Sequence, residues 1–330
     1  MFARPVIAFL TGGYSGEAEI SYLSAKTIEK NIDTSKYQAY KIDIRKDGWL
    51  YTHKDGKVYV VDKNDFSLLI GDEPVYFDAV LIGIHGTPGE DGKLQGYFDM
   101  LGIPYTSCDA TTSALTFNKR FTVAVAAFAG IHVAKSMHLF KERKIAIEDI
   151  SAQLQFPVFV KPNNGGSSIG MSKVNAADGL AEALEKAFRE DDQVLVEEFI
   201  SGREFTIGVF RSQGEIITLP FTEVIAKNEF FDFEAKYHGQ SEEITPAVVE
   251  EAIAQKVRAA ARQVYQVFNC RGVVRIDFIY NSVKEEPFML EINTVPGQSE
   301  ASIVPQQVRA MGWTLQDFYS ALIDDALAGK

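Results

Sequence analysis

Two short apolar segments near the C-terminal end of the chain carry charged and amide side chains that could bind a metal ion. The segments cover residues 272–280 and 287–293, and a polar connection separates them, so we expect an antiparallel hairpin. One register of this hairpin pairs two sets of polar residues at once. Because side chains alternate between the two faces of a strand, the polar residues then share one face. They are Arg275, opposite Asn293, and Asp277, opposite Glu291.

The chemistry of that polar face favours a hard cation. The opposite face would carry only apolar side chains, namely Val274, Ile276, Phe278, Leu290 and Ile292. Directly opposed side chains lie about 4.5–5.5 Å apart, where two carboxylates repel each other. An ordinary salt bridge to Arg275 is one way to offset the repulsion. The alternative is Mg²⁺, which takes oxygen ligands and is usually completed by water and substrate phosphates.

A second stretch could supply the phosphate site. An apolar run ends at Lys161 and leads into a loop of small residues, Asn163-Asn164-Gly165-Gly166-Ser167-Ser168. Small residues let backbone N–H groups approach phosphate oxygens, and Lys161 adds a positive charge. The order of lysine and glycines is the reverse of a Walker A loop. A flexible glycine-serine linker is the alternative interpretation.

Five further side chains are candidates on weaker grounds. Glu17 follows a Gly-rich turn that fails the dinucleotide fingerprint, and it could bind a ligand ammonium or serve in helix capping. His85 follows a predicted strand, where ligands gather in open α/β sheets, although structural hydrogen bonds would equally explain it. Lys119 could contact phosphate or be solvated. Glu197 and Glu204 could accept hydrogen bonds from adenosine or be surface acids.

The composition excludes some classes of function. The 330 residues suggest two or three domains, and 46% hydrophobic residues are enough for folded cores. A net charge of -12 argues against a nucleic-acid surface. The two cysteines have no metal-ligand spacing and are too few for a disulfide framework, which fits a reducing cytoplasm. No apolar run approaches the roughly 18 residues of a membrane span.

The elements that would position these residues alternate between strands and helices in the first third of the chain. We expect strands at 5–10, 37–44 and 77–84, a helix at 17–31 and a small hairpin at 49–61. Further on, helices are expected at 94–101, 110–129, 142–153, 176–189, 246–268, 303–311 and 315–327. These elements indicate an α/β fold that becomes α+β in the C-terminal part, with a second domain starting near Cys108. The aromatic loop 228–238 could cover a site or form a minor core.

Several motifs resemble those of the D-alanine–D-alanine ligases, a family of ATP-grasp enzymes. They occur in the family's order as GGYSGEAEIS, HGTPGEDGKLQG, LTFNKR, VKPNNGGSSIGMSKV, VEEFISGREFT, FFDFEAKY, RIDF and EINTVPGQSEASIVP. The resemblance covers nearly the full length. It implies a three-domain ATP-grasp architecture: an N-terminal α/β substrate domain with a parallel sheet (1–107), a central ATP-grasp domain (108–199) and a C-terminal ATP-grasp domain with the metal site (200–330).

The resemblance also implies the activity. One D-alanine would attack ATP to form D-alanyl phosphate and ADP, and a second D-alanine would then displace phosphate to give D-alanyl-D-alanine for peptidoglycan precursors. The expected cofactors are ATP and two Mg²⁺ ions, with Mn²⁺ as a substitute. The expected partners are small-molecule substrates and a second copy in a homodimer, with neither nucleic acid nor membrane. The expected location is the cytoplasm.

The roles that the resemblance implies fall into three groups. Metal binding falls to Asp277, Glu291 and Asn293. ATP binding falls to Lys119, Lys161, Ser168, Glu197, Glu198, Ile200, Glu204 and Lys236. Substrate binding and catalysis fall to Glu17, His85, Ser167, Tyr237, Arg275, Gly297 and Ser302. In this scheme Glu17 holds the first D-alanine's ammonium, Ser302 holds the second D-alanine's carboxylate, and Arg275 with the Gly297 N–H stabilises the oxyanion.

The chain departs from the family's pattern at two positions. Asn118 stands where many relatives carry Asp, and Glu198 stands where some carry Lys, which puts adenine contact at 198 in doubt. Tyr237 favours D-alanine as second substrate, because its replacement is typical of relatives that accept D-lactate. A D-alanine–D-lactate ligase, or one using another D-amino acid, is the nearest alternative. A nucleotide-binding module without catalysis is a more distant one, disfavoured by the intact polar hairpin face.

Overall fold

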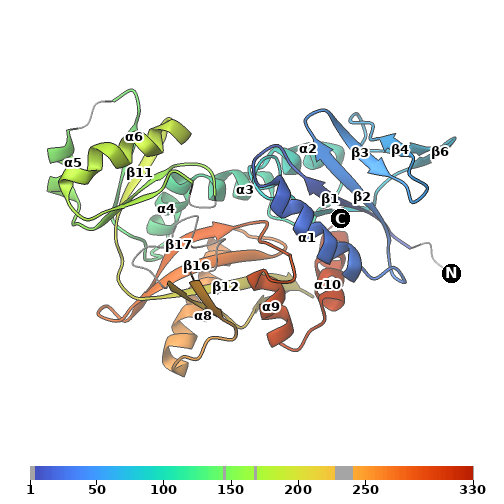
Figure 1. Cartoon of the computed structure of the whole chain (residues 1–330). Coiled ribbons are helices and arrows are strands. Elements are labelled where there is room, and N and C mark those ends of the chain that lie inside the picture. The colour runs from blue at the N-terminus through green and yellow to red at the C-terminus, as the bar shows by residue number, and fades with distance from the viewer. Residues whose placement is uncertain (1–3, 144–145, 167–168, 227–240, 330) are drawn as a thin grey trace.

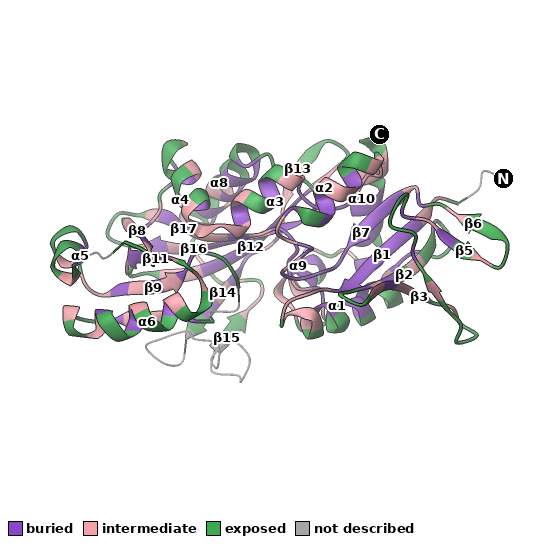
Figure 2. Ribbon diagram, turned by 90° about the horizontal axis from the view of Figure 1, so that it is seen from above, coloured by how far each residue is buried: buried purple, intermediate pink, exposed green. Residues whose placement is uncertain are grey.

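A computed structural model of the chain describes residues 4–143, 146–166, 169–226 and 241–329. Three main sheets follow one another along the molecule, which is elongated (Figure 1). The central strands of the three sheets are largely buried (Figure 2). The alternation of apolar residues along the strands accounts for this pattern, because each sheet buries at least one face.

The first sheet has the strand order β4-β3-β2-β1-β7. Its centre is parallel, because β1 pairs in parallel with both β2 and β7, as expected for an α/β unit, whereas β3 and β4 extend it antiparallel. The elements of this part are β1 (Val6–Gly12), α1 (Ala18–Asn31), β2 (Gln38–Arg45), β3 (Gly48–Thr52), β4 (Val58–Val60), the small hairpin β5 (Leu68–Ile70) and β6 (Glu73–Val75), β7 (Ala79–Ile82) and α2 (Lys93–Leu101).

The second sheet has the order β10-β9-β11-β8 and is antiparallel throughout. Helices α5 and α6 pack their apolar residues into the core of this sheet. The elements are β8 (Ser136–Phe140), α5 (Ile147–Gln153), β9 (Val158–Pro162), β10 (Ser172–Val174), the 3₁₀ turn η1 (Ala177–Gly179), α6 (Leu180–Glu190) and β11 (Gln193–Glu198). This layer presents the apolar run that ends at Lys161.

The third sheet has the order β15-β14-β12-β16-β17, with β13 paired to β12. The predicted hairpin forms its β16–β17 edge. The elements are β12 (Arg203–Ser212), β13 (Glu215–Thr218), β14 (Thr222–Ala226), β15 (Ser241–Ile244), α8 (Glu251–Val267), β16 (Val274–Asn281), β17 (Glu286–Asn293), α9 (Ile303–Ala310) and α10 (Leu315–Ala328). Helix α8 starts later than the sequence predicted, after Pro246 and four further residues.

The helix predicted over 110–129 is two helices, α3 (Ala110–Phe117) and α4 (Lys119–Phe128). Asn118 between them has an extended backbone, and its Oδ1 accepts a hydrogen bond from the N–H of Phe121 at 3.1 Å. Asn118 therefore ends one helix and caps the next. Although these residues were assigned to the central domain, apolar residues of both helices pack into the core of the third sheet. The domain boundary near 108 remains a prediction.

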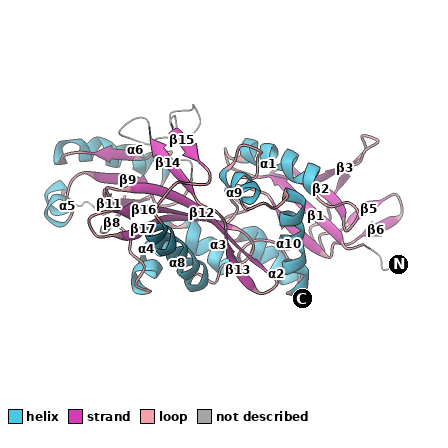
Figure 3. Ribbon diagram, turned by 90° about the horizontal axis from the view of Figure 1, so that it is seen from below, coloured by secondary structure: helices cyan, strands magenta, loops and turns pink. Residues whose placement is uncertain are grey.

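The C-terminal helices connect the third sheet with the first. Helix α10 contacts α1, β7 and β12, so that one hydrophobic core joins residues from both ends of the chain. Figure 3 shows α1, α9 and α10 gathered between the two sheets. At this junction Gly272 has a φ of +58°, and a Cβ there would lie 1.7 Å from the Thr106 carbonyl oxygen. Only glycine fits this close approach.

Candidate active site

A cavity of about 520 Å³ lies between the second and third sheets. Its lining includes residues from both sheets that the sequence proposed for nucleotide or metal binding. They are Lys119, Lys161, Glu197, Glu198, Ile200, Glu204, Asp277 and Glu291. Residues far apart in the chain are thus brought together, with lysines on one wall and carboxylates of the hairpin on the other.

The hairpin has the predicted register: Asp277 pairs with Glu291, and Arg275 pairs with Asn293. The apolar side is also as predicted for Val274, Ile276, Phe278 and Ile292, all of which are buried. Leu290 is the exception. The register shifts after Asp277, because Phe278 pairs with Met289. This bulge leaves Leu290 unpaired and directs it into the cavity instead of the opposite face.

Arg275 lies between the two carboxylates of the hairpin. Its Nε and Nη2 donate to Asp277 at 3.0 and 2.8 Å, and Nη2 lies 3.5 Å from Glu291 Oε1. Burial alone would lower the pKa of Arg275, but the charges of Asp277 and Glu291 and the Asp277 hydrogen bond raise it above its ordinary value. Arg275 therefore stays charged and offsets the repulsion between the carboxylates.

The donor set fits Mg²⁺ that is shared with a phosphate. Asp277, Glu291 and Asn293 offer only carboxylate and amide oxygens, and the Asn293 Nδ2 lies 3.5 Å from Glu291 Oε1. Within the described parts of the chain, no group of three or more His, Cys, Asp or Glu residues could hold a metal ion. Two carboxylates and one amide leave coordination positions for water and substrate oxygens, which is how Mg²⁺ is usually bound.

The phosphate wall is built around Lys161 and Asn163. Lys161 forms an ion pair with Glu197, and the two side chains are only 11% and 8% exposed. Asn163 accepts from the backbone N–H groups of Lys119 and Arg120, each at 2.9 Å, through its carbonyl and Oδ1. Lys119 Nζ donates to the Gly165 carbonyl at 2.6 Å. The loop and the start of α4 are therefore fixed to each other.

The adenosine candidates lie on β11, on the segment after it and on β12. Glu197 is buried and paired with Lys161. Glu198 Oε1 accepts from the Gln155 N–H at 2.8 Å, so this carboxylate already has a backbone partner. Ile200 and Glu204 line the cavity. Which of them contacts adenosine remains a prediction.

Glu17, the residue directly before α1, lies beside the phosphate loop that borders the cavity. Its carboxylate lies against two glycines: a Cβ on Gly86 would be 2.3 Å from Oε2, and a Cβ on Gly166 would be 2.9 Å from Oε1. Gly166 also lines the cavity. The acid predicted to hold a substrate ammonium is therefore next to the predicted phosphate loop.

His85 is buried and held by structural hydrogen bonds, as the alternative interpretation proposed. Its Nε2 lies 2.9 Å from Ser24 Oγ, and its ring also bonds to the backbone of Val295. Burial lowers the pKa of His85 to about 4, so the ring is neutral at ordinary pH. Its place beside the substrate remains a prediction.

Gly297 and Ser302 are neighbours in the segment after the hairpin. A Cβ on Gly297 would be 2.8 Å from Ser302 Oγ. That hydroxyl lies 2.7 Å from Ser299 Oγ, directly before α9. The predicted oxyanion donor and the predicted carboxylate ligand are thus adjacent. Four other predicted residues, Ser167, Ser168, Lys236 and Tyr237, lie outside the described residues, as does the aromatic loop.

Glu90 is a site residue that the sequence did not single out. Its carboxylate accepts from the Gly86 N–H at 2.7 Å and from the Val295 N–H at 3.3 Å. Burial, then the charge of Glu17, raises the pKa of Glu90 to about 7. The available clue was its place in the loop after a predicted strand, but a Glu-Asp-Gly sequence is also typical of an ordinary turn.

Comparison with known proteins identifies the family. The model for the D-ala D-ala ligase N-terminus matches residues 6–108, and the model for the D-ala D-ala ligase C-terminus matches residues 117–324. The D-alanine–D-alanine ligase of Flavobacterium johnsoniae is 43% identical over 322 residues, covering 98% of this chain and 99% of that protein. The chain belongs to the D-alanine–D-alanine ligase family.

Solved structures agree with this family assignment. The VanG D-Ala:D-Ser ligase of Enterococcus faecalis superposes with a TM-score of 0.88 at 31% identity, over 98% of this chain and 99% of that one. A D-alanine–D-alanine ligase of Bacillus anthracis complexed with ATP gives 0.79 at 26% identity, over 98% of both chains.

Membership of the family confirms the predicted ATP-grasp fold and the predicted ATP-dependent D-alanine–D-alanine ligase activity in peptidoglycan synthesis. Family members use ATP and, in general, Mg²⁺. The roles of individual residues remain predictions. Among the described residues, no helix is long and apolar enough to cross a membrane.

Proposed function

We propose that the cavity between the second and third sheets binds ATP so that its γ-phosphate lies between the phosphate loop and the hairpin. The observation that carries the proposal is the lining itself, in which Lys119, Lys161 and Gly166 face Asp277 and Glu291. Asp277, Glu291 and Asn293 hold two Mg²⁺ ions, for which Mn²⁺ can substitute. Bound there, the ions neutralise charge on the phosphates.

The first step forms an acyl phosphate. The carboxylate of the first D-alanine, whose ammonium pairs with Glu17, attacks the γ-phosphorus of ATP. The bond from that phosphorus to ADP breaks, and D-alanyl phosphate results. Lys119 and Lys161 orient the phosphates, so that this chain contributes mainly positioning and charge compensation.

The second step forms the peptide bond. The amine of the second D-alanine, after losing a proton, attacks the acyl carbon, and a tetrahedral oxyanion develops. Arg275 and the Gly297 N–H stabilise this oxyanion, while Ser302 holds the second D-alanine's carboxylate. Phosphate then leaves with the former carboxylate oxygen. Tyr237 with Ser167 completes the site toward the first D-alanine.

The experiment that tests this function measures phosphate release with ATP and Mg²⁺ in three mixtures. They contain D-alanine alone, D-alanine with D-serine, and D-alanine with D-lactate. Mass spectrometry identifies the product. We expect D-alanyl-D-alanine as the main product. Exclusive formation of a depsipeptide or of D-alanyl-D-serine would overturn the proposed second substrate, and tight ATP binding without any phosphate release would overturn catalysis.

Three finer expectations belong to the same proposal. The chain is expected to act as a homodimer in the cytoplasm, which sedimentation and cell fractionation test. Two ions per active site are expected, which Mg²⁺ and Mn²⁺ titrations of turnover test. A monomer of full activity would contradict the homodimer, recovery outside the cytoplasmic fraction would contradict the location, and turnover that depends on a single ion would contradict the two-ion site.

A further inference from the structure

Two side chains of the loop that follows β7 bond to the backbone of a single residue, Val295. Glu90 Oε1 accepts from the N–H of Val295 at 3.3 Å. The His85 ring bonds to the backbone of the same residue. A single loop of the N-terminal sheet therefore binds Val295, a residue from the other end of the chain, through two of its side chains.

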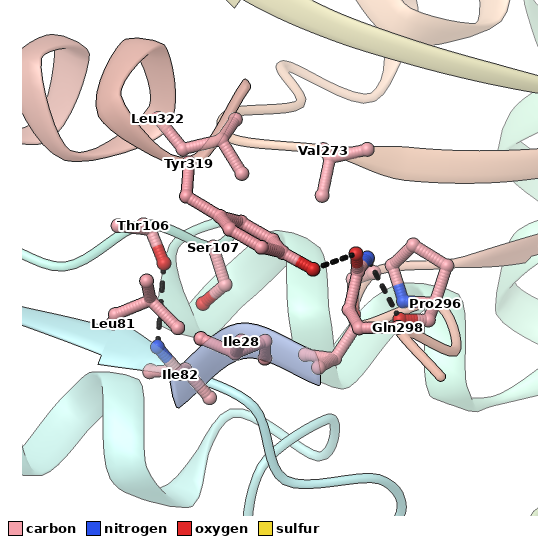
Figure 4. A pocket seen from close by; sticks show the side chains of 12 residues that line it. Ile28, Leu81, Ile82, Thr106, Ser107, Val273, Pro296, Gln298, Tyr319 and Leu322 are labelled. Carbon is pink, nitrogen blue, oxygen red and sulfur yellow. Dashed lines mark hydrogen bonds between the residues drawn. The ribbon is translucent and has the colours of Figure 1, made fainter. Parts of the chain in front are cut away.

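Among the described residues, no strand pairs with the segment that contains Val295. Strand β17 ends at Asn293 and α9 begins at Ile303. Other bonds fix it further on: the Gln298 N–H donates to Ser24 Oγ at 3.0 Å, and the Tyr319 hydroxyl donates to Gln298 Oε1 at 3.2 Å. Figure 4 shows Tyr319 directed at Gln298, with Ile28 of α1 close by. The position of Gly297, between these anchors, depends on them.

Glu90 also acts on the substrate side of the site. Its Oε2 accepts from the Gly86 N–H at 2.7 Å, and Gly86 is the residue against which the Glu17 carboxylate lies. One carboxylate thus connects the backbone beside Glu17 with the backbone that leads to Gly297.

We propose that Glu90 is a positioning residue of the ligation, which fixes the Gly297 N–H relative to Glu17 and so aligns the second D-alanine with the acyl carbon. The inference rests on the proposed function, because it assigns Glu17 and Gly297 to the two halves of the reaction. Glu90 is not among the described residues that line the cavity proposed for ATP, so the inference assigns it no contact with the nucleotide.

The test is Glu90→Gln in the full-length enzyme. A glutamine keeps one acceptor oxygen but presents an NH₂ group to the other backbone N–H, so one of the two bonds is lost. We expect kcat for dipeptide formation to fall about 10–100-fold, which corresponds to one such bond. The KM for ATP should stay within about 2-fold. The ratio of phosphate released to dipeptide formed should rise above one, because misaligned acyl phosphate is lost to water.

Asp91→Asn is the matched control. Asp91 is the next residue, and among the described residues its carboxylate bonds to Thr87 of the same loop and to Lys93 at the start of α2. This change perturbs the loop without touching Val295, so it should leave the ratio of phosphate to dipeptide at one. A Glu90→Gln enzyme with the kinetics of the Asp91→Asn enzyme would overturn the inference.

A second variant covers the case in which Glu90→Gln does not fold. Ser24→Ala removes the hydroxyl that accepts from the Gln298 N–H and should raise the same ratio by a smaller factor. An unchanged ratio in Ser24→Ala would also overturn the inference. If the wild-type enzyme formed no dipeptide, the proposed function itself would fail. Failure of the proposed function is thereby distinguished from failure of the role assigned to Glu90.

Discussion

The buried ion pair between Lys161 and Glu197 allows stability and catalysis to be separated. Lys161→Met leaves Glu197, whose side chain is 8% exposed, without its partner. An uncompensated buried charge costs about 3–5 kcal/mol, so we expect the thermal midpoint to fall by roughly 6–20 °C, at about 2–4 °C for each kcal/mol. The double variant Lys161→Met/Glu197→Gln removes both charges and should recover most of that loss.

The same variants test whether Lys161 contacts a phosphate of ATP. If Lys161 contacts a phosphate, the KM for ATP should rise about 10–100-fold in the single variant and remain high in the double variant. Differential scanning calorimetry and initial rates at varied ATP measure the two effects. Lys41→Met is the control, because its ion pair with Glu29 is 44% and 55% exposed and should be worth at most about 1 kcal/mol. A double variant that regains the normal KM for ATP would refute the phosphate role.

Three further predictions concern the hairpin, Glu17 and His85. Glu291→Gln should lower Mg²⁺-dependent turnover at least about 10-fold with little change in the thermal midpoint; loss of the fold with normal activity per folded molecule would make this face structural. Gly86→Ala should raise the KM for D-alanine, because the new Cβ displaces Glu17. Gly102→Ala is the control, since Gly102 has nearly the same φ of +67° and open space around it; this change should lower the stability only by the backbone strain, about 1–2 kcal/mol. In the unfolded state His85 binds a proton below about pH 6.5, whereas in the folded state, with a pKa of about 4, it stays neutral. The free energy of unfolding of the wild type should therefore fall by up to about 3 kcal/mol as the pH falls from 6.5 to 4. Urea unfolding should show this fall relative to His85→Gln, and a difference between the two proteins that does not depend on pH would count against it.

The register of the hairpin could be predicted because it depends only on alternation and on two polar pairs that agree. The bulge at Leu290 could not, since no Gly or Pro marks it and it depends on how β16 twists against β12 and β17. The break at Asn118 was missed for a related reason. A polar residue within a helical pattern is compatible with a continuous helix, and the long-range bridge from Asn118 to Asn164 that accompanies the break is not visible in the sequence.

Long-range pairing accounts for the other differences. Lys161 and Glu197 were proposed for opposite ends of ATP, but the antiparallel register of β9 and β11 places them together. Glu90 and His85 acquire their partners from Val295, more than 200 residues away in the chain. The sequence indicates which residue types can do chemistry, whereas the contacts that orient those residues depend on the packing of separate domains.

The transfer of a carboxylate oxygen tests the central claim most directly. D-alanine labelled with ¹⁸O in its carboxylate is incubated with ATP, Mg²⁺ and the enzyme, and the released phosphate and the dipeptide are analysed by mass spectrometry. Attack of the carboxylate on ATP predicts one labelled oxygen in each phosphate released, in equal amount to D-alanyl-D-alanine. Dipeptide formed together with unlabelled phosphate would contradict the acyl phosphate mechanism.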